Sequence, residues 1–369
     1  MNLGVGQSTG LTETPGAGNP PDGERSIELF RPALRFAACV AIVAAALSGC
    51  SSGSGAAAGN RLRLGYFPNL THATALLGVA NGTFGRALGP GVELRTSQFT
   101  SGPPAVTALL SDAVDAVFIG ATPAVNAYLK TKGNAVIVAG ATSGGAELVV
   151  RAGIDTPQQL RGRTVADPAL GGAQDVSLRY WLQQQGFQVG TAGDGDVHVA
   201  PQDNAQIAAA FAAGAIDGAW VPQPYAAQLV GKGAHVLVDE RELWPQGRFA
   251  TTELVVRSSY LKAHRETVVA LLRGLVQQTS QVGVDPDAAR AQANTVIAGI
   301  NGTRLADADL AGAWSQLTFT VDPLLSTVRE YARRGATVGV LPAGDLTGLA
   351  DLGPLNDALR AEGRPAVAE

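Results

Sequence analysis

From Arg61 onward, short apolar runs alternate with loops and with segments that have helical spacing. Each run is followed by a loop rich in Gly, Pro, Ser, Thr or Asn and then by a helix-like segment. Proline stands just inside two of these segments, at Pro104 and Pro123, where its backbone angle suits the first turn and its missing N–H is not needed. Strands alternating with helices of this length predict βαβ units and a mainly parallel sheet. We expect such units at residues 62–80, 92–110, 113–129 and 164–185.

The later part of the chain has mainly helical patterning. Between residues 261 and 276 the apolar side chains fall largely on one helical face. Shorter helices with polar faces are expected at 324–334 and 355–360. An alanine-rich helix at 204–213 precedes a predicted strand at 218–221.

The strand-like run ELVVR occurs twice, at residues 147–151 and 253–257. Two similar strands are expected if the chain leaves one lobe, builds a second and returns beside its exit. The other interpretation is that Leu-Val-Val triplets are common in buried strands. The first interpretation places residues 61–149 and 254–369 in lobe I and residues 150–253 in lobe II, with the two crossing strands as the hinge.

The segment before residue 50 has the pattern of an export signal. Two arginines precede a 12-residue apolar run at 36–47, which is too short to span a bilayer. The run ends in Leu-Ser-Gly-Cys and resembles the bacterial lipobox, in which the cysteine becomes the first mature residue and carries lipid. We therefore expect a signal peptide at 1–49, lipidation at Cys50 and a flexible tether over 50–60. The mature protein is then anchored at the outer face of the cytoplasmic membrane.

Composition excludes several other classes of protein. The chain has 31 acidic and 27 basic side chains and a net charge of −4, which is too acidic for a nucleic-acid binder. Its two cysteines are Cys39, inside the predicted signal, and Cys50, whose thiol the lipid consumes, so no disulfide is expected. We expect neither a metal site nor a cofactor, because no cysteine is available and the histidines show no ligand spacing. These histidines are His72, His198, His235 and His264.

Small polar residues gather where predicted strands end and predicted helices begin. Free N–H groups and the positive end of the dipole at a helix start attract anions. Ligands in open α/β sheets also sit beyond the carboxyl ends of strands. The alternative interpretation is that Ser, Thr and Gly are simply good caps. Together the loops predict an anion site without a basic side chain, built around Asn69 and Thr71, Ser101 and Gly102, Thr122, Ser143 and Gly144, and Gly171 and Gly172.

Six segments resemble the nitrate/sulfonate/taurine-binding family of ABC importer receptors. They are LGYFPNLTHA at 64–73, GATPA at 120–124, QDVSLRYWL at 174–182, WVPQPY at 220–225, LTFTVDP at 317–323 and the segment 348–355. The resemblance implies a two-lobed periplasmic-binding-protein fold of type II, with mostly parallel sheets flanked by helices. It implies a binding protein rather than an enzyme, which closes on a small oxyanion. Its expected partners are permease subunits with a separate ATPase, and we expect a monomer.

Carried over to the matching positions, the resemblance implies a set of ligand-binding residues. An aliphatic sulfonate is the expected ligand, with nitrate or taurine as further candidates. Taurine is less favoured than a plain sulfonate because the amide of Gln223 cannot pair with an ammonium group as a carboxylate can. The implied residues are Asn69, Thr71, His72, Ser101, Gly102, Thr122, Thr142, Ser143, Gln174, Asp175, Trp220, Gln223, Tyr225 and Thr251.

Three alternatives remain open from the sequence. A thiamine-type pyrimidine would need aromatic stacking, which Tyr66, Phe67, Trp220 or Tyr225 would have to supply. An enzyme on the same fold would need a paired acid and base in the cleft, and the lipobox argues against the cytoplasmic enzymes of this kind. Arg179, one helical turn beyond Asp175, could reach back into the cleft and make an arginine clamp.

Overall fold

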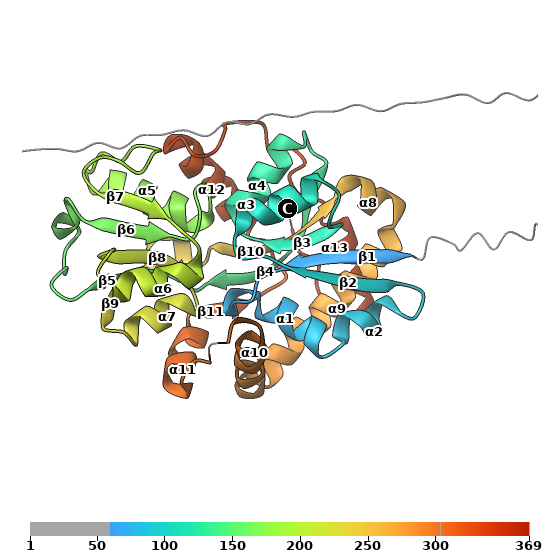
Figure 1. Ribbon diagram of the computed structural model, residues 1–369. Helices are drawn as coiled ribbons and strands as arrows, with labels where there is room; N and C mark the ends of the chain where they lie inside the picture. The colour runs from blue at the N-terminus through green and yellow to red at the C-terminus, as the bar shows by residue number, and fades with distance from the viewer. Residues whose placement is uncertain (1–59, 303, 369) are drawn as a thin grey trace, which may run out of the picture. The chain divides into compact units, whose positions relative to one another are not determined.

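The computed structural model describes residues 60–302 and 304–368. The predicted signal peptide, Cys50 and most of the tether lie outside the described residues. Two sheets organise the described chain, and each sheet with its helices is called a lobe here (Figure 1). The first sheet has the strand order β11 (Leu317–Phe319), β4 (Ala135–Gly144), β10 (Ala250–Arg257), β3 (Ala116–Ile119), β1 (Arg61–Tyr66), β2 (Glu93–Gln98). The second has the order β7 (His198–Pro201), β6 (Thr164–Asp167), β8 (Gly218–Pro222), β5 (Ala146–Arg151), β9 (Ala234–Asp239).

Each sheet is parallel in one part and antiparallel in the other. Strand β1 pairs in parallel with β2 and β3, and β6 pairs in parallel with β7 and β8. Strands β10, β4 and β11, and likewise β5 with β8 and β9, pair antiparallel. The expected βαβ units are present, but the prediction of mostly parallel sheets needs correction. Strands β5 and β10 lie beside the points where the chain changes lobes, and they enter their sheets in the opposite direction.

The chain passes from the first lobe to the second at Gly144 and Gly145. Both have positive φ, +82° and +78°, and a Cβ on Gly144 would lie 2.4 Å from the backbone carbonyl oxygen of Gln316, so glycine is required there. The chain returns between the end of β9 and the start of β10. Strand β5, which contains 147–151, therefore belongs to the second sheet, and β10 lies wholly in the first. The crossings thus lie a few residues before the predicted ones.

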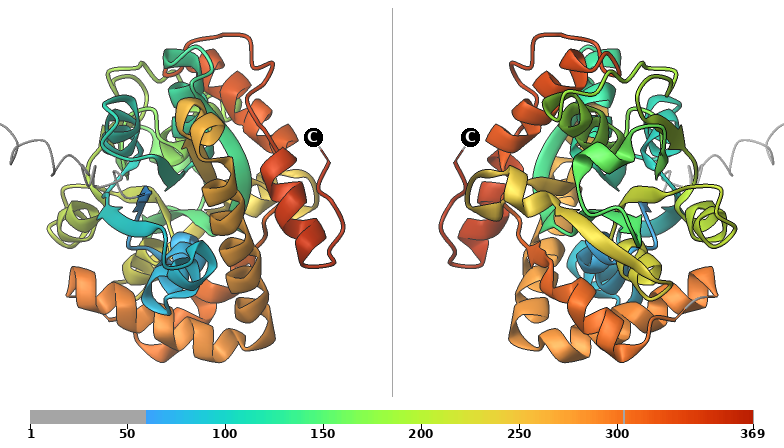
Figure 2. Two further views of the ribbon diagram at one scale, coloured as in Figure 1. Left: turned by 90° about the vertical axis from the view of Figure 1, so that its right-hand side faces the viewer. Right: turned by 90° about the vertical axis from the view of Figure 1, so that its left-hand side faces the viewer.

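Helices cover both sheets. In the first lobe they are α1 (Ala73–Ala80), α2 (Thr83–Leu88), α3 (Gly102–Leu110), α4 (Ala121–Lys130), α8 (Ser258–Ala263), α9 (Arg265–Val284), α10 (Pro286–Asn301) and α11 (Asp307–Ser315). In the second they are α5 (Ala173–Gln184), α6 (Asn204–Ala212) and α7 (Tyr225–Val230). The C-terminal helices α12 (Leu325–Thr337) and α13 (Gly353–Ala361), red in Figure 2, lie along one flank. Helix α12 packs on α4 and α5 and so touches both lobes.

The longest helix, α9, forms a large part of the first lobe's core. Val268, Leu271, Leu272 and Leu275 are fully buried on one face, as the sequence pattern predicts, and the helix packs on α1, α2 and α13. Burying each such side chain contributes roughly 1.5–3 kcal/mol. The predicted helix is divided at His264 into α8 and α9. None of the helices between residues 60 and 302 or between 304 and 368 has both the length and the apolar content to span a membrane.

Candidate ligand-binding site

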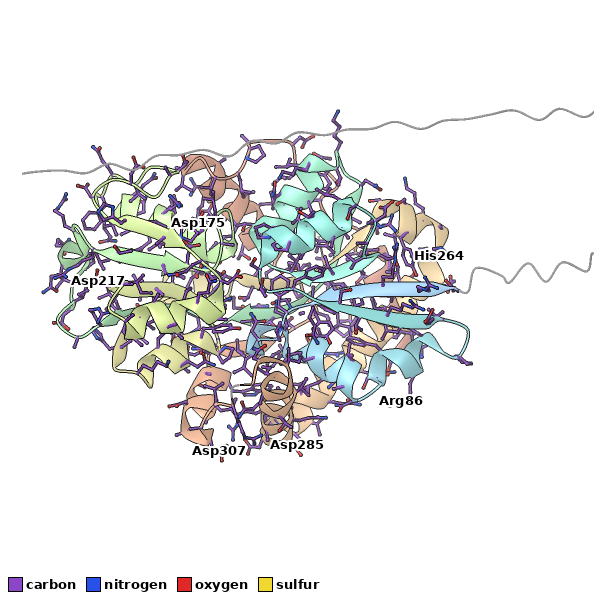
Figure 3. All side chains as sticks on the ribbon, viewed as in Figure 1. Arg86, Asp175, Asp217, His264, Asp285 and Asp307 are labelled. Atoms are coloured by element: carbon purple, nitrogen blue, oxygen red, sulfur yellow. The ribbon has the colours of Figure 1, made fainter. Side chains whose placement is uncertain are left out.

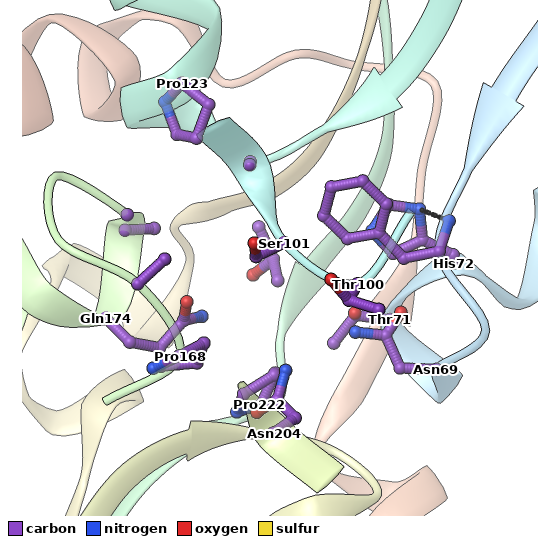
Figure 4. A pocket seen from close by; sticks show the side chains of 17 residues that line it. Asn69, Thr71, His72, Thr100, Ser101, Pro123, Pro168, Gln174, Asn204 and Pro222 are labelled. Atoms are coloured by element: carbon purple, nitrogen blue, oxygen red, sulfur yellow. Dashed lines mark hydrogen bonds between the residues drawn. The ribbon is translucent and has the colours of Figure 1, made fainter. Parts of the chain in front are cut away.

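A cavity with about 490 Å³ of empty space, part of it open to solvent, lies where the carboxyl ends of strands from both sheets face each other. We call it the central cavity (Figure 4). Its walls come from the loops that follow β1, β2, β3, β6, β7 and β8, and from β10. The lining residues are Phe67, Asn69, Thr71, His72, Thr100, Ser101, Gly102, Gly120, Pro123, Pro168, Ala169, Gly172, Ala173, Gln174, Asn204, Pro222 and Thr251.

Four helices begin at the central cavity. Ser101, Gly120, Gly172 and Asp203 occupy the capping positions of α3, α4, α5 and α6, and none of these caps has a side-chain hydrogen bond to its helix. The first N–H groups of a helix have no partner inside the helix. These helix starts therefore offer uncapped donors and positive dipole ends to the cavity.

Close packing places two of these helix starts together. A Cβ on Gly102 would lie 2.3 Å from the Pro123 ring, so the start of α3 can approach α4 only with glycine at this position. Proline at the second and third positions of α3 removes two N–H groups, which leaves the Gly102 N–H and the Ser101 hydroxyl as the donors there.

Three amide side chains, from Asn69, Gln174 and Asn204, surround the same space (Figure 4). Within residues 60–302 and 304–368, their NH2 groups donate to no protein acceptor, whereas the carbonyl oxygens of Asn69 and Asn204 are buried. The reachable unused groups of Asn69 and Asn204 are therefore donors, whereas Gln174 offers both its NH2 group and its carbonyl oxygen. They come from both lobes, so one small acceptor can contact both lobes at once.

The His72 imidazole is buried and stacks on Phe67 with the ring centroids 4.5 Å apart. The backbone N–H of Phe67 donates to Nδ1 at 3.4 Å, which places the ring hydrogen on Nε2. Burial lowers the pKa of His72 to about 3, so the ring is neutral at physiological pH. With His72 neutral, none of the 17 residues that line the cavity carries a charge.

Buried ionic contacts shape the loop between β6 and α5. Asp175 accepts from the Gly171 N–H at 2.9 Å and from Arg179 Nε at 2.6 Å, while Arg179 Nη1 donates to the Gly190 carbonyl at 2.6 Å. Burial, and then the neighbouring Asp175 charge, raises the pKa of Asp167. Figure 3 shows Asp175 inside the second lobe. Arg179 is held inside this network and does not line the central cavity, so the arginine clamp is not formed.

The comparisons with known proteins agree with this architecture. Residues 55–298 match the NMT1-like family.

The chain belongs to the NMT1-like family.

Over 209 residues, which are 56% of the chain, it is 29% identical to the taurine-binding periplasmic protein of Escherichia coli (strain K12). The chain spans 62% of the length of that relative. The predicted resemblance to nitrate, sulfonate and taurine receptors is confirmed.

Solved structures confirm the two-lobed α/β fold of this NMT1-like chain. The periplasmic nitrate-binding protein NrtA from Synechocystis PCC 6803 is 15% identical, with a TM-score of 0.68, and the match covers 84% of this chain and 91% of that one. The alkanesulfonate-binding protein SsuA from Xanthomonas axonopodis pv. citri, solved with bound MOPS, is 20% identical with a TM-score of 0.62. Its match covers 77% of this chain and 94% of that one. At these identities the likeness establishes the fold alone.

About half of the predicted site residues line the central cavity of this NMT1-like chain. They are Asn69, Thr71, His72, Ser101, Gly102, Gln174 and Thr251. The Thr251 hydroxyl donates to the Gly144 carbonyl at 2.7 Å, at the crossing between lobes. That these residues contact the ligand stays a prediction.

The other predicted residues have contacts away from the central cavity. The Thr122 hydroxyl donates across the lobes to the Gly171 carbonyl at 3.0 Å, and Ser143 Oγ accepts from the Phe249 N–H at 3.1 Å. Thr142 is buried within β4, and Asp175 belongs to the network described above.

Trp220, Gln223 and Tyr225 also point elsewhere. The Gln223 amide donates to Glu147 at 3.0 Å inside the second lobe. Gln223 therefore gives no reason to disfavour taurine, as the sequence argument did. Trp220 is fully buried and donates at 2.7 Å to Glu240, which also accepts from Ser177, Trp244 and Tyr331. Tyr225 lines a second cavity, described below.

Sequence reasoning missed some lining residues, of which Asn204 is the most informative polar one. It begins α6 directly after β7, in the same strand-to-helix arrangement that identified the other loops. Thr100 and Pro222 had the same signal, since each directly follows a run predicted as a strand. Phe67 is considered above only as a possible stacking partner. Across the described residues, no group of three or more His, Cys, Asp or Glu side chains is arranged to hold a metal ion.

Proposed function

We propose that this protein is the extracytoplasmic, lipid-anchored substrate-binding component of an ABC importer and that it captures a small oxyanion between its lobes. An aliphatic sulfonate is the class we place first, with nitrate and taurine as further candidates. The ligand is delivered to permease subunits that a separate ATPase drives. The lipid anchor rests on the lipobox-like sequence at Cys50.

The observation that carries the proposal is the chemistry of the central cavity. Its polar groups include hydroxyls, amide NH2 groups and uncapped helix starts, and none of its lining side chains is charged. Such neutral donors stabilise an anion while avoiding the cost of burying a cationic side chain. The names of the taurine- and nitrate-binding relatives agree with this class of ligand.

The two alternatives have weaker support. A thiamine-type pyrimidine needs an aromatic ring to stack on. Apart from His72, the lining residues offer only the ring of Phe67, and that ring already stacks on His72. An enzyme of the general acid–base kind needs a paired acid and base, and the 17 lining residues include no carboxylate.

Isothermal titration calorimetry of the full chain against methanesulfonate, ethanesulfonate, taurine, nitrate and a thiamine-type pyrimidine tests the proposal. At least one of the anions should bind, and Gln174→Ala should weaken its binding about 10- to 150-fold, because a hydrogen bond to a charged group contributes roughly 1.5–3 kcal/mol. Gln184→Ala, an exposed position on the same helix, is the matched control. Binding of the pyrimidine and of no anion would refute the proposal.

A further inference from the structure

A second, larger cavity adjoins the central one, with about 1510 Å³ of empty space that includes space open to solvent. The two cavities share Phe67, Asn69, Thr100 and Asn204 as lining residues, so they meet at the start of α6. The outer walls of the second cavity come from α6 and α7 of the second lobe and from the segment between α10 and α11. These elements lie together in Figure 1, and α7 packs on α11.

The second cavity differs from the central one in its charge. It is lined by Asp203, Lys232, Arg304 and Asp309, together with Tyr225 and other polar side chains. Asn204 lines both cavities, and Asp203 directly precedes it in the sequence. Among the four charged residues, Asp203 is therefore the one next in sequence to the place where the two cavities meet.

Asp203 is available to a ligand. Although it occupies the capping position of α6, its side chain makes no cap hydrogen bond, and within the part of the chain that the structure describes it forms no ion pair. Arg304 donates instead to the Thr295 hydroxyl at 3.0 Å. The Asp203 charge is also close enough to Tyr225 to contribute, after burial, to the raised pKa of that phenol.

Building on the proposed function, we infer that the anionic head of the ligand occupies the central cavity while its tail enters the second cavity, and that this tail carries a hydrogen-bond donor, such as a protonated amine, that Asp203 accepts. The ligand is then an organic anion with a polar tail. Nitrate, which has no tail, would leave the second cavity to water. Tyr225, implied by the sequence resemblance, then contacts the tail.

Calorimetry of the full chain with three sulfonates tests this inference. Methanesulfonate has the head alone, pentanesulfonate adds an apolar tail, and aminobutanesulfonate with a terminal amine has a tail of the same length that ends in a donor. The amine should improve affinity about three- to fivefold over pentanesulfonate, since an exposed ion pair contributes up to roughly 1 kcal/mol. Asp203→Asn should remove this preference, which is measured as the ratio of the aminobutanesulfonate and pentanesulfonate affinities of the same variant. Any general effect of the lost charge on anion binding cancels in that ratio.

Filling the second cavity provides an independent test. Ala205→Phe adds an aromatic ring at an exposed residue that lines only this cavity, and it should weaken both tailed sulfonates at least about tenfold, because their methylene groups lose burial. Methanesulfonate binding should stay within twofold. The control is Ala209→Phe, at an exposed position on the same helix outside the lining.

Three outcomes would overturn the inference. If Ala205→Phe leaves the tailed ligands unaffected, the tail does not enter the second cavity, although the proposed function stands. If Asp203→Asn preserves the preference for the amine, Asp203 is not its acceptor. If wild-type protein binds none of the three sulfonates and no other anion, the proposed function fails and the inference fails with it.

Discussion

The substitution Glu147→Gln should change how the stability of the protein depends on pH. Glu147 lies on β5, is 5% exposed and accepts a hydrogen bond from the Gln223 amide at 3.0 Å. Burial, with a smaller contribution from the Asp239 charge, raises the pKa of Glu147 to about 7, although Arg241 and Gln223 act in the opposite direction. Gln keeps the size of the side chain and an oxygen for Gln223, and it removes the titration.

The sign and the size of the effect follow from the two pKa values. Below about pH 4.5, the ordinary value, the carboxyl is protonated in both the folded and the unfolded chain, so it contributes no difference. Between pH 4.5 and 7 the unfolded chain loses the proton that the folded chain keeps, so folding stability falls as pH rises. Above about pH 7 the loss is complete, and the interval corresponds to about 3 kcal/mol.

Urea unfolding at pH 5 and pH 8 measures this effect. Relative to the wild type, Glu147→Gln should be more stable at pH 8 than at pH 5 by about 2 to 3 kcal/mol. The buried acids Asp167 and Glu253 also have raised pKa values, and their contributions cancel in this comparison. Glu242→Gln, an exposed substitution nearby, is the control. Parallel stability profiles for wild type and Glu147→Gln between pH 5 and 8 would refute the reasoning.

Four further predictions concern other parts of the molecule. Thr122→Ala removes the bond to the Gly171 carbonyl that joins the lobes, so calorimetry should find about 2- to 12-fold weaker ligand binding; an unchanged Kd would count against a role in closure. Glu240→Gln places an NH2 group against buried donors and should lower the free energy of unfolding by about 1–3 kcal/mol in urea, whereas equal stability would contradict the network. The His72 ring should stay neutral down to about pH 4, and an NMR titration with a midpoint near pH 6.5 would show that the burial argument is wrong. Cys50→Ser should abolish lipid labelling and release the protein or leave an uncleaved precursor, and a labelled, membrane-bound variant would rule out the lipobox interpretation.

Local signals in the sequence predicted most of the elements. The apolar run at 62–67 overlaps β1 in all but its first residue, the run at 113–119 contains β3, and the predicted segment 73–80 is helix α1. The reason is that strand and helix periodicity, and proline in a first turn, act within a few residues of the chain. The same locality explains why the loops containing Asn69, Ser101 and Gln174 were identified correctly as neighbours of a cavity.

Strand direction and side-chain contacts between distant residues were beyond the reach of the sequence. The ELVVR runs are identical in sequence, yet one lies in each sheet, because pairing partners decide membership and a period of two is the same in both environments. Arg179 could be a ligand clamp or a buried partner by its spacing alone, and only the packing of α5 brings it to Asp175 and Gly190.

The division is therefore between local and long-range physics. The sequence by itself determined the α/β elements, the family, and the character of the cavity loops, because these depend on residue type and short spacing. The tertiary structure decided which polar groups remain free for a ligand. Thr122, Trp220 and Gln223 bond to partners 49, 20 and 76 residues away, whereas Gln174 and Asn204 keep unused donors at the cavity. Most buried polar groups find a partner, and which partner is near enough depends on how distant segments of the chain pack.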